Sequence, residues 1–333
     1  MNISYHTIKA GLNPSVGFGY AGLNIVRELN SLGHSVKFAD PKSDFQINFT
    51  QPHLFKLHRN QYQIGYTPWE STSMRPDWVD IFNICDEVWA TSDWVAEVYK
   101  NCGITKPIYV YPHGIEDIWK PKKRNLVDDK PFRFLHIGEP SPRKSGQMVA
   151  ETFIKMFGGN PEYHLTIKAH HSSSIRVPDK AGNNVSPETI YTNITLITEE
   201  YSIENLVDLY HRHHVLLYPS WGEGFGFIPL QGLATGMPVI STIPWAQYKK
   251  YLGPLALKSQ LSDETLPQSV GDPHQGKMYK PDQKHLEEQM YDAVINFKAY
   301  SGYYYAQSTK IHEEYNWNQL TKNILKHLEK KFK

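Results

Sequence analysis

One stretch, Val215 to Thr242, constrains the fold more than any other part of the chain. It runs V-L-L-Y-P-S-W-G-E-G-F-G-F-I-P-L-Q-G-L-A-T-G-M-P-V-I-S-T. The first four apolar residues are typical of a buried parallel strand, and the proline and three glycines that follow end it. Apolar spacing then predicts a helix from Phe227 to Thr235, with a proline tolerated in its first turn. Gly236 suits a left-handed helix end, and Pro238 blocks further helix. The stretch therefore predicts a strand, loop, helix and strand of an α/β fold.

The loop of this unit is a candidate binding site. Backbone N–H groups and the helix N-terminus around Gly224, Phe225 and Gly226 favour an anion or a dense set of hydroxyls above them. Glu223 adds a fixed acceptor. Gln231 follows eight positions later, about two helical turns along and on roughly the same side. From the residues alone, a plain strand-to-helix turn with an incidental glutamate is the alternative interpretation.

The run G-E-G-F-G-F-I-P-L-Q-G-L-A-T-G-M-P-V-I resembles the donor-sugar motif of retaining glycosyltransferases of family 4. The resemblance implies the GT-B fold, an α/β fold in which two Rossmann-like domains face a cleft and a C-terminal helix crosses back to the first domain. It also implies that Glu223 holds hydroxyls of the transferred sugar. The second glutamate of the family motif, which grips the nucleotide ribose, is Gln231 here. A neutral amide can still hydrogen-bond ribose, but more weakly than a carboxylate.

The length of 333 residues suits two domains. On the GT-B pattern, residues 1–120 are predicted to form an N-terminal acceptor domain and residues 131–300 a nucleotide-sugar donor domain. Residues 301–333 are predicted to be the helix that packs back on the first domain. Between the domains, Lys120 to Lys130 is charged and lacks apolar periodicity, so a solvated linker is expected.

The N-terminal domain begins with a predicted strand at 1–8 and a glycine-rich run, G-F-G-Y-A-G, at 17–22. Helical spacing starts only at Leu23, so residues 9–22 are predicted to be a loop. A dinucleotide fingerprint would follow its strand more tightly than this run does. The resemblance instead assigns Gly17 and Gly19 to a loop that faces the donor diphosphate and the acceptor.

Two further residues of this domain are candidates for the active site. Glu70 follows a predicted strand, at the end where α/β proteins bind ligands. It could contact the acceptor or the sugar, or accept a proton; capping a helix through the following S-T-S is the alternative. His113 lies in P-H-G-I-E-D, which resembles the stretch that closes the first domain beside the cleft. The resemblance implies that His113 reaches the active site, and a purely structural histidine is the alternative.

The second domain is predicted to begin with a strand at Phe132 to Ile137 and a turn, G-E-P-S-P-R-K-S-G. The resemblance implies that this turn supplies an arginine and a lysine to the donor diphosphate, whose developing charge fixed cations stabilise. Lys144 matches the family lysine. Glu139 stands where the family arginine is expected, and Arg143 is predicted to take over its role. By the same resemblance, Glu199 to Ser202 would contact the nucleobase.

Together these features predict a retaining glycosyltransferase that moves a sugar from a UDP- or GDP-sugar to an acceptor hydroxyl, in the first instance of a saccharide. No cofactor and no metal are expected, because the adjacent His170 and His171 lack partners at ligand spacing. Three alternatives stay open. Gln231 and Glu139 motivate a catalytically weakened nucleotide-sugar-binding protein. A transferase acting on a modified base in DNA, and a phosphorylase or epimerase with the same cleft, are the others.

The net charge and the distribution of apolar residues limit which partners and which location are expected for this protein. A net charge of +1 gives no overall field toward nucleic acid or an anionic membrane. The N-terminus lacks the pattern of a signal peptide, and no run approaches the roughly 20 apolar residues of a spanning helix, so a cytoplasmic location without membrane insertion is expected. The oligomeric state stays open. His211, His213 and His214 are expected at a helix end, where charged histidines would face carbonyl groups.

Overall fold

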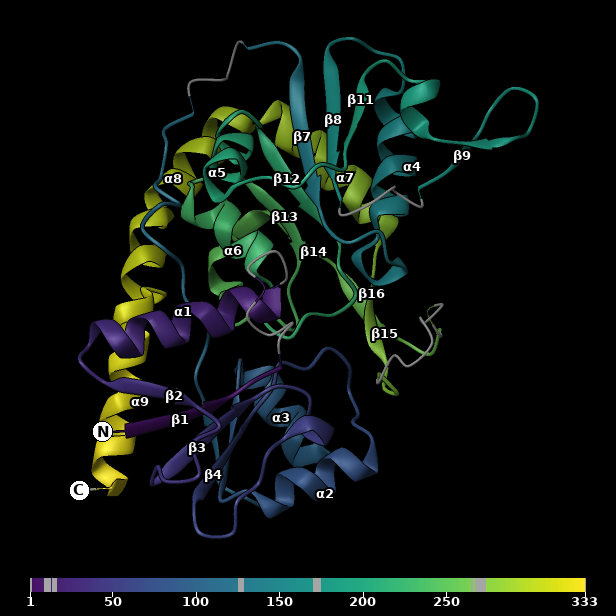
Figure 1. Cartoon of the computed structure of the whole chain (residues 1–333). Helices are drawn as coiled ribbons and strands as arrows, with labels where there is room; N and C mark the ends of the chain where they lie inside the picture. Colours follow the sequence, from purple (N-terminus) through teal and green to yellow (C-terminus); the bar gives the residue numbers. More distant parts are fainter. Residues whose placement is uncertain are drawn as a thin grey trace.

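The computed structural model describes residues 2–8, 13, 17–124, 129–169, 175–264, 266 and 274–332. It contains two separate six-stranded parallel sheets flanked by helices (Figure 1). The strand order is β2-β1-β3-β4-β5-β6 in the first sheet and β11-β8-β7-β12-β13-β14 in the second. Parallel sheets with crossover helices are what alternating strand and helix patterns predict, and the α/β fold class is confirmed.

The first sheet and its helices come from the N-terminal part of the chain. The elements are β1 (Asn2–His6), α1 (Gly17–Ser31), β2 (Ser35–Phe38), β3 (Phe45–Phe49), η2 (Pro52–Leu54), β4 (Tyr62–Tyr66), α2 (Pro76–Ile84), β5 (Glu87–Ala90), α3 (Asp93–Asn101) and β6 (Ile108–Val110). The expected loop at Gly17 and Gly19 is wrong, because α1 already begins at Gly17. A Cβ at position 19 would lie 2.1 Å from the carbonyl oxygen of Asn13, so close packing explains this glycine.

The second sheet follows the same scheme. Its elements are β7 (Phe132–Ile137), η3 (Pro142–Lys144), α4 (Gly146–Phe157), β8 (Tyr163–Lys168), β9 (Val177–Pro178), β10 (Asn184–Val185), η4 (Pro187–Thr189), β11 (Ile194–Ile197), α5 (Ile203–His211), β12 (Val215–Tyr218), α6 (Phe227–Ala234), β13 (Val239–Thr242), η5 (Lys249–Tyr251), η6 (Gly253–Leu255), β14 (Ala256–Leu257), β15 (Ser259–Ser262), β16 (Met278–Pro281) and α7 (Gln283–Ile295). The predicted strand, loop, helix and strand are confirmed as β12, α6 and β13. Strand order reverses between β7 and β12, and α/β proteins bind ligands at such a switch point.

The last two helices belong to different domains. Helix α8 (Phe297–Glu314) packs on α6, whereas α9 (Trp317–Phe332) packs on α1 (Figure 1). The expected return of a C-terminal helix to the first domain is confirmed for α9, whereas residues 301–314 of the predicted helix belong to α8 and pack on the second domain. Where the chain crosses back, the Ile115 N–H donates to the Tyr315 carbonyl at 2.6 Å, beside a parallel bridge between Ile115 and Asn316. None of the helices in the described part of the chain is long and apolar enough to cross a bilayer.

The buried carboxylate of Glu87 fixes α9 to the first sheet. Its oxygens lie 2.7 Å from Lys331 Nζ and 2.9 Å from His327 Nε2, both on α9. The Trp89 indole N–H donates to it at 2.7 Å. A fully buried carboxylate is tolerated only when it is paired and hydrogen-bonded, so these contacts belong together.

The expectation of a solvated linker is wrong at Arg124, which is only 4% exposed. Its guanidinium donates to the carbonyls of Thr235 (2.9 Å), Tyr210 (3.1 Å) and His213 (3.2 Å). These carbonyls lie at the C-terminal ends of α5 and α6, where partial negative charge favours a cation. Burial lowers the pKa of Arg124 to about 9. The linker is therefore attached to the second domain at this residue.

The prediction of charged histidines after α5 is wrong for His213. Its Nδ1 donates to the Leu209 carbonyl at 2.6 Å, so Nε2, 2.8 Å from the Thr166 hydroxyl, accepts. Burial lowers the pKa of His213 to about 3, so the ring is neutral at pH 7. His214 likewise faces the sheet, where its Nδ1 accepts from the Arg133 N–H at 3.0 Å.

Three buried histidines make the fold acid-sensitive. Burial lowers the pKa of His113 and His213 to about 3 and that of His136 to about 4. As pH falls below about 6.5, the unfolded chain takes up protons that the folded chain does not, so stability present above that pH is lost. We expect a loss on the order of 1–2 kcal/mol per histidine between pH 6.5 and 5. Urea unfolding at several pH values measures it, and a flat profile over this range would contradict the burial.

Candidate active site

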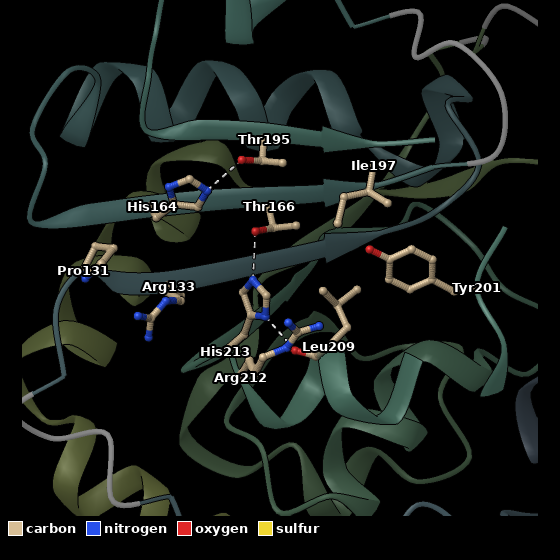
Figure 2. Close-up of a pocket in the computed structure, with 10 residues that line it drawn as sticks. All are labelled: Pro131, Arg133, His164, Thr166, Thr195, Ile197, Tyr201, Leu209, Arg212 and His213. Carbon is tan, nitrogen blue, oxygen red and sulfur yellow. Dashed lines mark hydrogen bonds between the residues drawn. The ribbon is translucent and has the colours of Figure 1, made fainter. Parts of the chain in front are cut away.

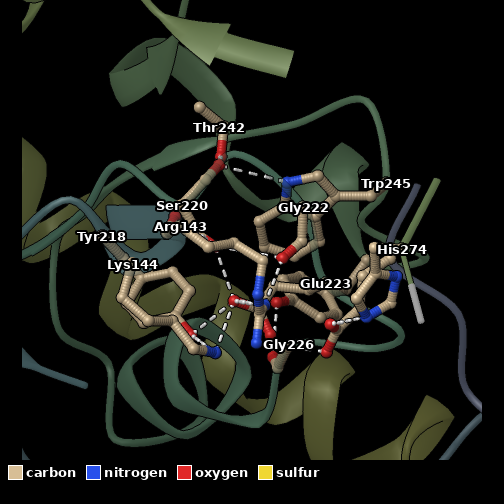
Figure 3. A network of polar contacts seen from close by, with 12 residues as sticks. Arg143, Lys144, Tyr218, Ser220, Gly222, Glu223, Gly226, Thr242, Trp245 and His274 are labelled. Carbon is tan, nitrogen blue, oxygen red and sulfur yellow. Dashed lines mark hydrogen bonds and ion pairs between the residues drawn. The ribbon is translucent and has the colours of Figure 1, made fainter. Parts of the chain in front are cut away.

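Glu223 is the centre of a polar network between the two domains (Figure 3). It lies in the loop between β12 and α6 and is 6% exposed. Donors from two adjacent segments converge on its Oε1: Lys144 Nζ (2.6 Å), Ser220 Oγ (2.6 Å), Tyr218 OH (2.9 Å) and Arg143 Nη1 (3.2 Å). The sequence-predicted Glu223, Lys144 and Arg143 are thus in direct contact.

The sheet brings these segments together because β7 and β12 are neighbours. Arg143 and Lys144 lie on η3, which follows β7, and the loop with Glu223 follows β12. The Trp221 N–H donates to the Arg143 carbonyl at 2.9 Å, which joins the two backbones. Helix α4 begins only at Gly146, after Ser145 with a φ of 58°. Arg143 and Lys144 therefore precede the helix rather than lie in its first turn.

Burial and charge act against each other in this network. Burial raises the pKa of the Glu223 carboxyl, but Lys144 and Arg143 more than offset this and hold it below its ordinary value. Burial lowers the pKa of the Lys144 amine, and the Glu223 carboxylate opposes that shift only in part. The pKa of Arg143 is raised, because Glu70 and Glu223 outweigh its burial. The network is a cluster of ion pairs between residues of opposite charge.

Glu70 joins this network from the first domain. Its Oε1 lies 3.3 Å from Arg143 Nη2, and its Oε2 lies 2.7 Å from His274 Nε2. The alternative of a helix cap is wrong, because α2 begins only at Pro76. Burial raises the pKa of Glu70, but Arg143 and His274 more than offset it and lower the pKa well below the ordinary value. Glu70 therefore brings a second carboxylate to Arg143.

The glycine loop packs directly on the first domain. A Cβ at Gly222 would lie 2.2 Å from the Glu70 carbonyl oxygen, and one at Gly224 would lie 2.3 Å from Pro68 Cβ. The Thr91 hydroxyl donates to the Gly224 carbonyl. Together with the buried Phe225 and with Gly226, this loop leads into α6, whose first N–H groups have no partner within the helix.

His113 lies against the same loop. Its ring is parallel to Phe227 at 5.3 Å between centroids and 5.0 Å from the ring of Phe225. The Tyr66 hydroxyl donates to the Tyr111 carbonyl at 2.6 Å, so in its 3.1 Å contact with His113 Nδ1 the histidine is the donor. His113 is therefore neutral with an acceptor at Nε2, and a role in catalysis remains a prediction.

Gln231 and the glycines of α1 lie apart from the contacts of Glu223. Gln231 Oε1 accepts from the Tyr210 hydroxyl at 3.2 Å, and its side chain lies near the Tyr20 hydroxyl. A Cβ at Gly17 would lie 3.6 Å from the ring of Phe227, so the start of α1 faces the start of α6. The ribose role of Gln231 and the diphosphate role of Gly17 and Gly19 remain predictions.

Sequence reasoning missed Tyr218, Ser220 and His274. Tyr218 and Ser220 precede Glu223 by five and three positions, and hydroxyls at the end of a buried strand were a usable signal. The Tyr218 hydroxyl accepts from Lys144 at 2.9 Å and donates to Glu223, so it couples the two. His274 lies in an irregular segment without any local pattern.

A hollow of about 290 Å³ lies on the face of the second sheet, apart from the Glu223 network (Figure 2). The surface that lines it is mostly apolar and comes from β7, β8, β11, α5 and the residues beside them: Pro131, Arg133, His164, Thr166, Thr195, Ile197, Tyr201, Leu209, Arg212 and His213. Tyr201 belongs to the segment predicted for the nucleobase, and the Lys168 ammonium lies 5.4 Å from its ring. His170 and His171 lie outside the described residues. Within the described residues, no group of three His, Cys, Asp or Glu side chains could hold a metal ion.

Neither a family model nor a curated protein matches the sequence. Solved structures do match in fold. Sucrose-phosphate synthase from Thermosynechococcus elongatus is 12% identical over 99% of both chains, with a TM-score of 0.71. HepE from Anabaena, solved with UDP-glucose, is 10% identical over 99% of this chain and 100% of its own, with a TM-score of 0.68. A glycosyltransferase from Rickettsia africae is 11% identical over 98% and 97%, with a TM-score of 0.67. The chain has the GT-B fold of these proteins.

Proposed function

We propose that this protein is a retaining glycosyltransferase that moves a sugar from a nucleotide-diphosphate sugar, with UDP or GDP as the nucleotide, to an acceptor hydroxyl. A saccharide is the acceptor class proposed. The convergence of Lys144 and Arg143 on Glu223, at the switch point of a GT-B fold, is the observation that carries the proposal. HepE, a protein of the same fold, was solved with UDP-glucose, which supports the donor class.

In this mechanism Lys144, Arg143 and the N-terminus of α6 hold the donor diphosphate. The bond between the anomeric carbon and the diphosphate oxygen breaks, and its electrons stay on the diphosphate. The acceptor oxygen forms the new bond on the same face, and its proton passes to the departing diphosphate. Negative charge develops on the departing diphosphate. Fixed cations placed beside it usually make the largest single contribution to rate enhancement. Protein side chains suffice for these steps.

Glu223 and Glu70 take different parts in the proposal. Glu223 accepts hydrogen bonds from hydroxyls of the transferred sugar, because a buried ionised carboxylate is a strong acceptor. Glu70 lies on the acceptor domain and pairs with Arg143 across the domain boundary. Glu223 and Glu70 pair with the same cations, Lys144 and Arg143, that would bind the diphosphate.

A donor panel tests the function. The full-length protein is mixed with UDP-glucose, GDP-mannose, ADP-glucose and TDP-glucose, and both thermal stabilisation and slow donor hydrolysis are measured. We expect one donor to stabilise and to be hydrolysed, with release of the free nucleoside diphosphate and a sugar of retained configuration. A ligand at 100 times its Kd stabilises by about 2.7 kcal/mol, which a thermal shift resolves.

The outcomes separate the candidate functions. Binding without turnover in the presence of saccharide acceptors would favour a nucleotide-sugar-binding protein. Release of a sugar phosphate would indicate a phosphorylase. An inverted product would contradict retention, and failure of every donor to bind would contradict the transferase proposal as a whole.

A further inference from the structure

A second polar cluster surrounds Gln231 and joins both domains. Tyr20 on α1 donates its hydroxyl proton to Glu116 Oε2. The Trp119 indole N–H donates to the Tyr20 oxygen at 3.3 Å. The side-chain amide of Gln231 on α6 is close enough to the Tyr20 hydroxyl to lower its pKa, whereas burial and the Glu116 carboxylate raise it more strongly. The cluster thus runs from Glu116 through Tyr20 to α6.

The direction of the protons explains the amide at position 231. Tyr20 has one proton, and Glu116 accepts it, so any further partner of the Tyr20 oxygen must be a donor. The Gln231 amide group can donate there while its Oε1 accepts from Tyr210. An ionised glutamate could not donate, and it would place a second negative charge near Glu116. Gln231 is therefore the residue that this cluster requires.

The cluster also has a carboxylate within reach of a ligand. Glu116 pairs with the exposed Arg27 at 3.4 Å, and its own side chain is 17% exposed. A carboxylate accepts about four hydrogen bonds, so Glu116 can take two more beside those from Tyr20 and Arg27. Two neighbouring acceptor oxygens match a vicinal diol, as in the acidic residue that binds a ribose hydroxyl in dinucleotide-binding proteins.

The spacing along α6 matches one nucleotide. Gln231 lies four residues beyond Phe227, the start of α6, which corresponds to about 6 Å along the helix axis. A diphosphate at the N-terminus of α6 therefore places its ribose near this cluster, since one methylene joins the ribose to the α-phosphate. Phe227 itself contacts Tyr20, with ring centroids 4.9 Å apart.

We infer that Glu116, oriented by Tyr20 and tied to α6 through Gln231, binds the ribose hydroxyls of the donor nucleotide. The inference rests on the proposed function. In the family motif the ribose-binding carboxylate lies on the helix that contains Gln231 here. In this protein the carboxylate would instead come from Glu116, at the end of the first domain. A donor whose diphosphate is held by the second domain would then contact the first domain through its ribose.

Calorimetric titration of the full-length protein tests this with UDP and 2′,3′-dideoxy-UDP, or with the GDP pair if the donor panel selects GDP. Losing hydrogen bonds to a charged group costs roughly 10- to 100-fold in affinity. We therefore expect wild type to bind the dideoxy nucleotide roughly 10- to 100-fold more weakly than UDP. Glu116→Gln should bind UDP equally weakly and discriminate the two nucleotides less than about 3-fold. A purely structural role of Glu116 would leave this discrimination intact.

Two further variants sharpen the test. Gln231→Glu is expected to weaken UDP binding, whereas tighter binding would overturn the inference and return the ribose role to position 231. Asp117→Asn is the control, because Asp117 is the exposed neighbour of Glu116 outside this cluster, and the UDP affinity of that variant should stay within about 2-fold of wild type. If wild type binds UDP and Glu116→Gln still discriminates UDP from the dideoxy nucleotide as wild type does, this inference is refuted and the proposed function stands. Absence of binding to any nucleoside diphosphate removes the proposed function with it.

Discussion

Glu223→Gln is expected to lower kcat/KM for the nucleotide-sugar donor by at least about 100-fold while binding of the free nucleoside diphosphate is kept or strengthened. The amide fills the same space but no longer offers an ionised acceptor to the sugar hydroxyls. Removal of its charge also frees Lys144 and Arg143, now 2.6 and 3.2 Å from Glu223 Oε1, for the diphosphate. Donor turnover and calorimetry with UDP measure the two effects separately.

The control for this variant is Glu162→Gln, a 60%-exposed carboxylate of the same domain. It should retain activity and stability, because its pairing with Lys130 is on the surface. Glu223→Gln leaves two buried cations short of a partner, and such a loss costs roughly 3–5 kcal/mol of stability. Thermal unfolding with and without UDP therefore accompanies the kinetics. Near-wild-type turnover in folded protein would refute the role of Glu223.

Lys144→Met is expected to weaken nucleoside diphosphate binding about 10-fold or more and to lower turnover by about 100- to 1,000-fold. Methionine keeps much of the side-chain volume but removes the charge that faces the departing diphosphate. Because burial lowers the pKa of Lys144 below that of a free lysine, wild-type activity should decline on the alkaline side below pH 10.5. The variant should lack that decline.

Lys155→Met is the matched control, on the neighbouring helix α4. Lys155 is 65% exposed and pairs with Glu287, so its loss should change neither diphosphate affinity nor the pH profile. Equal effects of both lysine variants would show that general surface charge, rather than a contact at the site, causes the loss.

Local chemistry explains why the sequence predicts the centre of the site. The proline in the first turn of α6 and Gly236 after its end favour a helix with the observed start and end. The cations at Lys144 and Arg143 follow a strand whose neighbour in the sheet is set by parallel topology. The resemblance to the family motifs, together with this sheet topology, therefore predicts that Glu223, Lys144 and Arg143 come together.

The remaining features depend on contacts between distant segments. Gly17 and Gly19 have the local signature of a loop but lie in α1, where Gly19 packs against the backbone of Asn13 and Gly17 lies near the ring of Phe227. Arg124 sits in a charged run, and only the ends of α5 and α6 make its burial favourable. His274 approaches Glu70 from more than 200 positions along the chain. Sequence periodicity carries no information about such approaches.

The chain connects the two domains twice, once through the linker after Ile115 and once between α8 and α9, and this arrangement limits how the domains can move. Arg124 fixes the linker to the second domain, so the freedom to rotate is confined to a short stretch before it. The segment around Ile115 and the break between α8 and α9 lie side by side and share a hydrogen bond. Both covalent connections thus meet in one hinge, about which the domains can open and close without stretching the chain. An opening about this hinge would separate Glu70 from Arg143, whereas Lys144 and Glu223, both in the second domain, would stay paired.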